Sequence, residues 1–504
     1  MMNQIITTLI QRAQHTPDDT AFSGSRHGLQ QQSRLSYSQL LARVQQAAEL
    51  LQAWSVNCIA LRADNSLDWV IIDLAAMYAR IPIVPVPMFF SQAQVEHTLQ
   101  QSGADLLVGE WLESHGIADD RIEGFDVWRL PSGLPQWLPD SSKITFTSGS
   151  TGQPKGVCLG QKQLIEVSCA LAAAIQADVC CKTHLVMLPL STLLENITGV
   201  YVPILLGANS VVLSGSEVGL SGSSQFDARQ FASALEQYQP NSLVLTPALL
   251  MALIQVATLQ PALTRSLTFV AVGGARVSAP LLQRAQACGI PAFEGYGLSE
   301  CASVVSVNTP SHSKPGTSGR VLPHVEVRIA DDGEVLVRGN LALGYIGEPF
   351  GHSWLATGDL GALDQDGFLT ISGRKKNQII TAFGRNVSPE WIESEAQAMP
   401  ALMGMIVVGE GQYGLTAVLD GDISDAIMGS MTRLNQHLPD YARITRLVTA
   451  PGLKHRAGLF TSNGRPVRQR LEQWLNQLDE QESGIVFTAV THPGLHGSSR
   501  YINE

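Results

Sequence analysis

The sequence predicts an α/β protein with a large N-terminal domain of stacked α/β sheets, a small β unit attached to it, and a small α+β C-terminal domain. Three observations predict this fold. Helix-like and strand-like patterns alternate through the first half of the chain, short strand-like runs follow Pro323, and a polar, charged stretch at 374–378 separates about 130 further residues. Alternation of helix and strand is typical of βαβ units and a largely parallel sheet.

Periodicity places the elements of the first half. Apolar positions three and four residues apart predict an amphipathic helix at 37–54, and 68–80 is expected to be a second helix. Apolar runs of strand length, bounded by turn residues, predict buried strands at 58–63, 81–87, 241–247 and 267–274. The last two of these strands bracket a helical segment at 248–259.

The second half changes in texture after Pro323. Alternating runs predict short antiparallel strands at 325–330, 333–339 and 368–373, with Asp331-Asp332-Gly333 as a hairpin turn. The charged stretch that follows is the expected domain boundary. The predicted domains are therefore residues 1–373 and 374–504.

Charge and composition exclude several classes of function. The chain has 504 residues and a formal net charge of -11, without a basic run, so nucleic acid is not an expected partner. The seven cysteines are scattered and suggest neither a disulfide framework nor a zinc site. The N-terminus lacks the pattern of a signal peptide, and polar residues interrupt the apolar stretch 185–213. We expect a cytoplasmic protein without an integral membrane segment.

The sharpest motif runs from Thr147 to Gly156, with the sequence TSGSTGQPKG, directly after a strand-like run. Its glycines allow backbone N–H groups to converge, its hydroxyls add donors, and Lys155 supplies a cation. Such a nest suits a polyphosphate, although it is not the common P-loop. On composition alone, a Ser/Thr/Gly loop without a ligand is an equal alternative.

The order of these residues resembles the phosphate loop of the adenylate-forming (ANL) superfamily, which includes acyl-CoA synthetases, luciferases and peptide-synthetase adenylation domains. Further motifs of that superfamily match in order at 295–300 (GYGLSE), 357–359 (TGD) and 373–380 (GRKKNQII). The resemblance spans about residues 5–475 and is closest to the fatty-acyl-CoA ligase branch. It implies the adenylate-forming enzyme fold, with a mobile C-terminal lid and a hinge near Lys376.

The resemblance also implies roles for individual residues. The catalytic set is Lys155, Ser299, Glu300 and Arg465, and Glu300 is the expected Mg²⁺ ligand. The residues expected to bind the nucleotide are Thr147, Ser148, Gly149, Ser150, Thr151, Gly152, Gly273, Gly274, Ala275, Gly295, Tyr296, Asp359, Arg374 and Lys376. Phe383 and Gly384 are expected along the path of the thiol.

One residue departs from the superfamily pattern. Members place a lysine in a sequence like T-x-x-G-K-x-x-R to bridge the substrate carboxylate and ATP, whereas this chain has Arg465 there. Arginine keeps the charge, but its planar fork is not equivalent to an ammonium group. Slower adenylation is therefore one expectation.

The implied function is ATP-dependent activation of a small carboxylic acid to an acyl-AMP, then transfer to a thiol, most simply coenzyme A. A fatty or other apolar acid is favoured, because the surroundings of Glu195 resemble fatty-acyl and aryl-acid enzymes more than the amino-acid site of peptide synthetases. Two alternatives stay open. One is a ligase that loads the phosphopantetheine arm of an acyl carrier protein, and the other is an acyl-adenylate-binding protein whose catalysis is weakened by Arg465. Residues from about 480 to 504 lie beyond the resemblance. They are expected to form either a strand plus a tail or a docking element.

Overall fold

The computed structural model of the chain describes residues 3–29, 32–111, 118–131, 137–147, 154–221, 225–351, 353–382, 384–461, 464–477 and 486–490. These residues form two compact units. Unit 1 comprises residues up to 277, with 282–357 and 361–371. Unit 2 comprises residues from 372 onwards, with 278–281 and 358–360.

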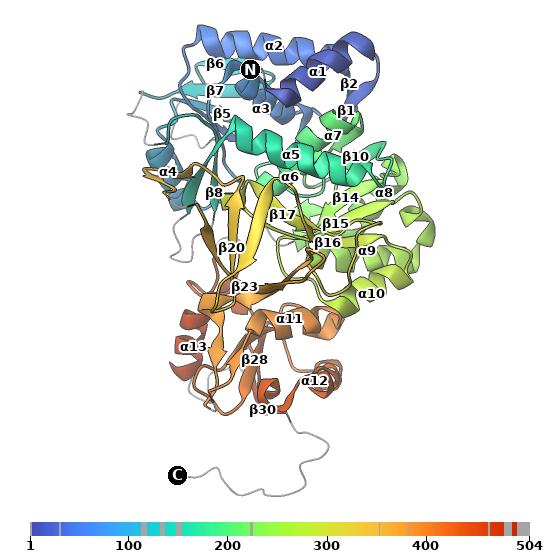
Figure 1. Ribbon diagram of the computed structural model, residues 1–504, viewed down its shortest axis with the longest axis vertical. Coiled ribbons are helices and arrows are strands. Elements are labelled where there is room, and N and C mark those ends of the chain that lie inside the picture. The colour runs from blue at the N-terminus through green and yellow to red at the C-terminus, as the bar shows by residue number, and fades with distance from the viewer. Residues whose placement is uncertain are drawn as a thin grey trace, which may run out of the picture. The chain divides into compact units, whose positions relative to one another are not determined.

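Two nine-stranded sheets build unit 1 (Figure 1). In strand order, the first sheet is β18 (Arg320–Val321), β17 (Ser303–Val307), β16 (Ala292–Leu298), β15 (Phe269–Val272), β14 (Ser242–Leu245), β10 (Thr183–Leu185), β11 (Asn209–Val212), β1 (Thr20–Ser25) and β2 (Gln32–Ser36). The second is β22 (Glu348–Pro349), β21 (Gly344–Tyr345), β9 (Lys155–Gly160), β8 (Ser141–Thr147), β4 (Ile83–Pro85), β3 (Ile59–Arg62), β5 (Leu106–Gly109), β7 (Phe125–Arg129) and β6 (Asp120–Ile122). The central strands of both sheets run parallel, as the alternating pattern predicts.

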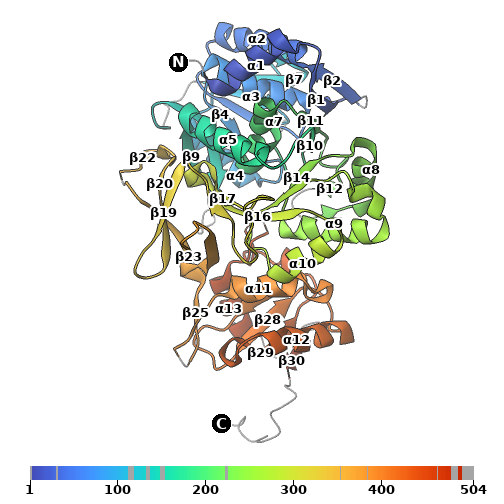
Figure 2. The same ribbon diagram turned by 45° about the vertical axis from the view of Figure 1, so that its right-hand side comes forward.

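Helices cover these sheets and fill the space between them. They are α1 (Gln4–His15), α2 (Tyr37–Ala53), α3 (Leu67–Ala79), α4 (Gln92–Ser102), α5 (Gln161–Gln176), α6 (Leu193–Asn196), α7 (Val202–Leu206), α8 (Ala228–Tyr238), α9 (Pro247–Leu259) and α10 (Ala279–Ala287). A π-helical turn, Ile197–Tyr201, joins α6 to α7. Figures 1 and 2 both show α8 and α9 beside β14.

Local sequence explains where these helices begin. Ser36 starts α2 with a capping box, in which its side chain accepts from the Gln39 N–H and the Gln39 side chain accepts from the Ser36 N–H. Ser66 caps α3 in the same position, by accepting from the N–H of Trp69. The apolar face that each helix then presents joins one core.

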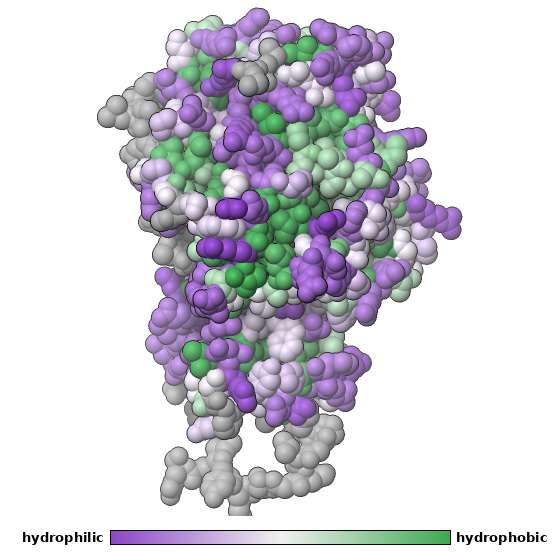
Figure 3. Space-filling model, viewed as in Figure 1, coloured by the Kyte–Doolittle hydropathy of each residue, from purple (hydrophilic) through white to green (hydrophobic). Residues whose placement is uncertain are grey.

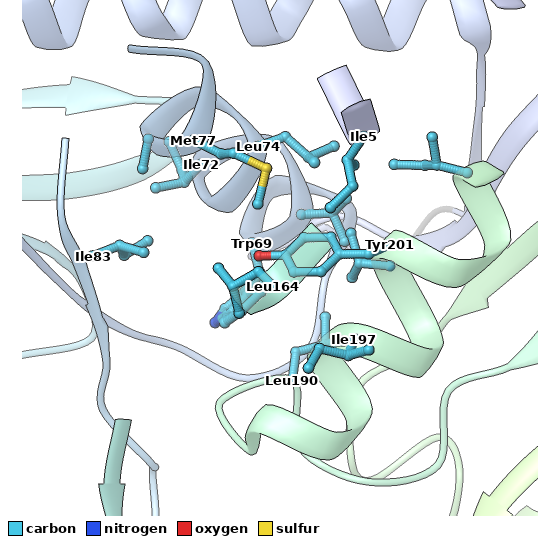
Figure 4. Close-up of a cluster of buried hydrophobic side chains, with 14 of the residues drawn as sticks. Ile5, Trp69, Ile72, Leu74, Met77, Ile83, Leu164, Leu190, Ile197 and Tyr201 are labelled. Atoms are coloured by element: carbon cyan, nitrogen blue, oxygen red, sulfur yellow. The ribbon is translucent and has the colours of Figure 1, made fainter. Parts of the chain in front are cut away.

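That core unites both sheets with the helices between them. Figure 4 shows its centre, where Trp69 of α3, Leu164 of α5 and Tyr201 of the π-helical turn pack together. Side chains of both sheets, among them Phe22 and Ile83, belong to the same cluster. The predicted strands and helices of the first half are confirmed by this arrangement, and the apolar stretch 185–213 is a buried segment of it. No helix among the described residues is long and apolar enough to cross a membrane.

The attached small β unit is a four-stranded sheet, in the order β19 (Val325–Ile329), β20 (Glu334–Gly339), β23 (Leu355–Leu363) and β24 (Leu369–Arg374). Strands β19 and β20 pair antiparallel around the predicted turn, where Gly333 has a φ of +83°. Such a left-handed conformation favours glycine.

The space-filling view, from the same side as Figure 1, shows hydrophobic residues gathered in the middle of unit 1, near α5 (Figure 3).

Unit 2 has its own sheet with helices on both faces. The sheet is β27 (Ile406–Val408), β28 (Leu415–Leu419), β29 (Ile444–Thr449) and β30 (Val486–Ala489), and the helices are α11 (Pro389–Gln397), α12 (Asp425–His437) and α13 (Arg468–Gln477). Alternate residues of β27 face opposite ways: Val407 packs with α11 and α12, while Ile406 packs with α13. Strand β30 pairs with β29, so part of the segment beyond residue 480 is a strand.

Candidate active site

The predicted phosphate loop lies between β8 and β9, which pair antiparallel in unit 1. The last pair in the register joins Thr147 to Lys155. The five other predicted loop residues, Ser148, Gly149, Ser150, Thr151 and Gly152, lie outside the described residues. The structure therefore describes the two ends of the loop, and the Lys155 side chain at one end is exposed.

His97 on α4 contacts both ends of this loop. Its Nε2 lies 3.0 Å from the main-chain oxygen of Pro154, and its ring meets Phe146 edge-on at 6.5 Å. Because a carbonyl oxygen only accepts, Nε2 carries the proton of this hydrogen bond. His97 could not be predicted from the sequence, since no spacing signal links α4 to a loop more than 50 residues away.

Tyr345 brings two of the predicted catalytic residues together. Its hydroxyl donates to Glu300 Oε1 at 2.9 Å, and the Lys155 ammonium lies 5.0 Å from the centre of its ring. Strand β21, which carries Tyr345, pairs with β9 directly after the phosphate loop. Burial raises the pKa of Tyr345, and the carboxylate of Glu300 raises it further, so the phenol stays a donor. No motif in the sequence predicts a role for Tyr345.

The glycine-rich segments predicted to bind the nucleotide belong to two neighbouring strands: Gly273 directly follows β15, and Gly295 lies within β16. Strands β15 and β16 pair in parallel, with Val272 beside Glu294. A Cβ on Gly273 would lie only 3.4 Å from the main-chain oxygen of Gly295. The structure thus places Gly273 beside Gly295, with Gly274 and Ala275 next in the loop and Tyr296 next in the strand. Ser299 and Glu300 follow in a single 3-10 turn.

Unit 2 carries the remaining predicted residues around one carboxylate. Asp359 Oδ1 pairs with Arg374 Nε at 2.8 Å, and the Asp359 side chain is 5% exposed while that of Arg374 is 42% exposed. Gly358, directly before the aspartate, has a φ of +72°. A hollow of about 270 Å³ lies here, lined by Gly358, Arg374, Lys375 and Lys376.

Like charges repel one another in this cluster. Incomplete hydration lowers the pKa of Lys376, and the positive charges of Arg374 and Arg465 lower it further, while Asp359 opposes them. The pKa of Arg465 is lowered for the same reasons, by lost hydration and then by Arg374. The structure therefore groups three cations with the carboxylate of Asp359, while Glu390 also acts on Lys376, and the excess of positive charge attracts anions.

Arg465 is presented by a short closed loop. The main-chain N–H of Thr461 donates to the oxygen of Arg465 at 2.8 Å, and the Thr461 hydroxyl accepts from the Arg465 N–H at 3.1 Å. Arg468 has a different role, because its guanidinium forms two hydrogen bonds to Glu393, at 2.6 and 2.7 Å. It joins α13 to α11, so the second arginine of the motif is a structural anchor.

Glu195 is buried and bound within unit 1. Its side chain is fully buried, Oε1 accepts from the N–H of Met187 at 3.1 Å, and His184 Nε2 lies 3.6 Å away. Burial raises the pKa of this carboxyl, and His184 opposes the shift. The side chain thus packs inside the fold.

Phe383, predicted on the thiol path, lies outside the described residues, whereas Gly384 is described with a φ of +69°.

Comparison with known protein families finds one match over most of unit 1. The model of the family described as AMP-binding enzyme matches residues 9–346. A long-chain-fatty-acid–CoA ligase of Mycobacterium bovis is 28% identical over 430 residues, which cover 70% of this chain and 71% of that protein. A feruloyl-CoA synthase of an Amycolatopsis species is 28% identical over 453 residues, covering 82% and 88%.

Solved structures give the same picture for the fold. The o-succinylbenzoate CoA synthetase of Bacillus subtilis, in complex with its acyl-adenylate intermediate, has a TM-score of 0.73 at 22% identity and covers 92% of this chain and 97% of that one. The same synthetase in complex with ATP and magnesium has a TM-score of 0.69 at 21% identity, covering 92% and 99%. The fold class predicted from the sequence is confirmed.

Proposed function

The chain belongs to the AMP-binding enzyme family, and on that premise we propose that it is an acid–thiol ligase that forms AMP. A carboxylic acid reacts with ATP to give an acyl-adenylate and pyrophosphate, and the thiol of coenzyme A then displaces AMP to give the thioester. The ligases and synthetases described above support this class of reaction.

One arrangement carries the proposal, which is the meeting of Lys155 and Glu300 at Tyr345. A cation at the end of the phosphate loop suits the oxygens of ATP, and a carboxylate beside it suits a divalent cation. The Tyr345 hydrogen bond uses one carboxylate oxygen of Glu300, and a carboxylate accepts at both. Glu300 therefore fits Mg²⁺, which when bound would neutralise charge on the phosphates.

The other residues bind and orient the reactants. The hydroxyl of Ser299 is proposed to donate to the α-phosphate, and Asp359 to accept from the ribose hydroxyls while Arg374 holds its other side. Arg465 is proposed to bridge the substrate carboxylate and the phosphate in the adenylation step, in place of the lysine of related enzymes. Lys376 is proposed as the hinge about which unit 2 turns between the two half-reactions. No residue of the chain need become acylated, because charge stabilisation and positioning suffice.

The proposed substrate is a fatty or other apolar acid. An amino acid would need a carboxylate to hold its ammonium group, and Glu195, in the stretch that corresponds to the amino-acid site of peptide synthetases, is buried against His184 and Met187. All seven cysteines are free, which supports a reducing compartment such as the cytoplasm.

Pyrophosphate release tests the proposal. Purified protein is given ATP and Mg²⁺ with a ladder of fatty, aryl and amino acids, with and without coenzyme A. We expect release with one class of apolar acid, and stimulation by coenzyme A. Stimulation by an acyl carrier protein but not by coenzyme A would show that the carrier protein is the thiol acceptor. If no acid gives pyrophosphate release, the protein is not a ligase of this kind.

Matched lysine variants locate the activity. Lys155→Met should lower pyrophosphate release by about 10²-fold, the loss typical of one preorganised charge at a transition state. Lys162→Met changes an exposed lysine on α5 that pairs with Glu166 one turn along its helix, and should leave the rate unchanged. Equal rates of pyrophosphate release for the two variants would show that Lys155 does not take part in the reaction.

A further inference from the structure

Glu294 is a buried carboxyl directly before the predicted nucleotide residues Gly295 and Tyr296. Its side chain is 6% exposed. The hydroxyl of Ser318 donates to its Oε1 at 3.0 Å, and the main-chain N–H of Val277 donates to the same carboxyl. No motif of the sequence drew attention to this residue.

The partners of Glu294 come from two other segments of unit 1. Val277 and Arg276 end the loop that follows β15 and contains Gly273 to Ala275, while Ser318 precedes β18. The backbone of Glu294 is anchored separately, because Asn308 donates to its oxygen both from the main chain, at 2.9 Å, and from the side-chain amide, at 3.1 Å. The strand is thus fixed by its backbone, which leaves the carboxyl to hold the loop.

We propose that Glu294 is a positioning residue for the nucleotide, and that its ionised carboxylate holds the loop 273–277 in the conformation that receives ATP. The inference deepens the proposed function and rests on it, since that function places the adenine beside this loop. Protonation releases the loop, because a neutral carboxyl no longer attracts the guanidinium of Arg276 and one of its oxygens ceases to be a simple acceptor. ATP binding therefore weakens when the carboxyl takes up a proton.

The groups around the Glu294 carboxyl determine the pH at which it takes up the proton. Burial raises the pKa of Glu294 to about 7, against the lowering effects of Ser318, Arg276 and the Val277 N–H. Arg276 is the charged group acting on the carboxyl among the residues that the structure describes. The hydroxyl of Ser318, which faces the carboxyl from the segment before β18, does not titrate in this range.

Stability argues that the carboxylate is kept for function. The pKa of Glu294 in the folded state lies above its ordinary value of 4.5. The folded protein therefore binds this proton more tightly than the unfolded chain, and stability falls as the pH rises from about 4.5 to about 7. An amide at this position would avoid that loss, because it never ionises. A purely structural role would favour glutamine here.

The test compares Glu294→Gln with Glu326→Gln, whose carboxylate lies in an exposed pair with Arg338 on the small β unit. Binding of ATP with Mg²⁺ is measured by calorimetry from about pH 5.5 to about pH 8.5, together with the midpoint of thermal unfolding. We expect the wild type and Glu326→Gln to lose at least about threefold in ATP affinity between about pH 8 and about pH 6. Glu294→Gln should bind ATP at about pH 8 as weakly as the wild type does at about pH 6 and should lack this step. Since ATP itself titrates in this range, the step is read as the difference between the variants.

The unfolding measurement separates the possible failures. Glu294→Gln should unfold at a higher temperature than the wild type at about pH 8, and at the same temperature at about pH 5. A variant that keeps the wild-type affinity and its pH step would overturn the inference. So would a variant that binds ATP weakly and is also less stable at both pH values, since that combination indicates general damage. If the wild type binds no ATP and releases no pyrophosphate with any acid, the proposed function fails, and this inference fails with it. A wild type that binds ATP but releases no pyrophosphate contradicts the ligase alone.

Discussion

Positive side chains occur in two opposite settings in this molecule. In unit 1, Lys143 on β8 is fully buried, and its ammonium donates to Asp73, to Asn196 and to the hydroxyl of Tyr201. In unit 2, Arg374, Lys376 and Arg465 lie around the carboxylate of Asp359 beside a hollow, and Glu390 is the second carboxylate that acts on Lys376.

The difference lies in how the charge is balanced. Asp73 neutralises Lys143 and also accepts from Asn196, at 3.0 Å, and from Tyr201, at 2.8 Å, so the network is closed upon itself. The cluster in unit 2 has an excess of positive charge that lowers the pKa values of its own members. A balanced buried network holds elements in place, whereas an unbalanced exposed one attracts an anion.

Removing the buried ammonium is expected to have the largest effect. Lys143→Met leaves Asp73 uncompensated in the core and should destabilise unit 1 by about 3–5 kcal/mol. Urea unfolding followed by tryptophan fluorescence measures this loss, because Trp69 lies beside the network, with its ring 5.9 Å from the ammonium. A variant that unfolds at the wild-type urea concentration would show that the pair is not balanced as described.

A double variant sharpens the same comparison. Lys143→Met combined with Asp73→Asn removes both charges, and should recover most of the stability lost in the single variant. Lys162→Met, on the exposed face of α5, is the control for loss of a lysine and should unfold like the wild type. If the double variant is no more stable than Lys143→Met, the packing of the lysine stem matters more than its charge.

Much of the fold could be predicted because periodicity is local. The helix at 37–54 and the strands at 58–63 and 267–274 were each readable from the spacing of their own apolar residues, and the structure has α2, β3 and β15 there. The buried network could not be predicted in this way. Lys143, Asp73 and Tyr201 meet only because three distant segments pack together, and a lysine within a strand-like run is ordinarily taken for a solvated residue.

The residues of the candidate site are likewise of two kinds, those that a sequence motif predicts and those that only the structure reveals. The contiguous motifs, such as GYGLSE at 295–300, could be found because their residues act together in one stretch. Tyr345 and His97 could not, since their relevance lies in a contact with Glu300 and with the end of the phosphate loop. The placement of the loop residues 148–152 and the hinge at Lys376 stay predictions.

Removing a cation from unit 2 should affect catalysis more than stability. Arg465→Ala is expected to lower pyrophosphate release by about 10²-fold with little change in unfolding, because an exposed like-charged cluster gains stability when one charge leaves. The second half-reaction, started from a preformed acyl-adenylate and coenzyme A, should change much less. A comparable loss in both half-reactions would mean that Arg465 supports unit 2 as a whole.

Arg465→Lys separates a working substitute from a weakened enzyme. If arginine fulfils the bridging role, lysine should give no gain, or a loss, in the rate of pyrophosphate release. A large gain would instead favour the protein that holds an acyl-adenylate with weakened catalysis. Lys143 differs from Arg465 in this respect, since no other positively charged side chain at its position can keep all of its hydrogen bonds.

The smallest expected effect is a change in the titration of Lys376. Arg465 and Arg374 both lower the pKa of this lysine, so Arg465→Gln should raise it toward the value of an ordinary lysine. The measurement is the pH dependence of Lys376 labelling by an amine-reactive reagent, read by peptide mass spectrometry. Salt should produce the same rise in the wild type, because it screens charges at the surface. Lys143 is the internal control: it should stay unlabelled at every salt concentration while the protein is folded. If the labelling curve of Lys376 is the same with and without Arg465, the two side chains do not share a cluster, and the contrast between the two settings is lost.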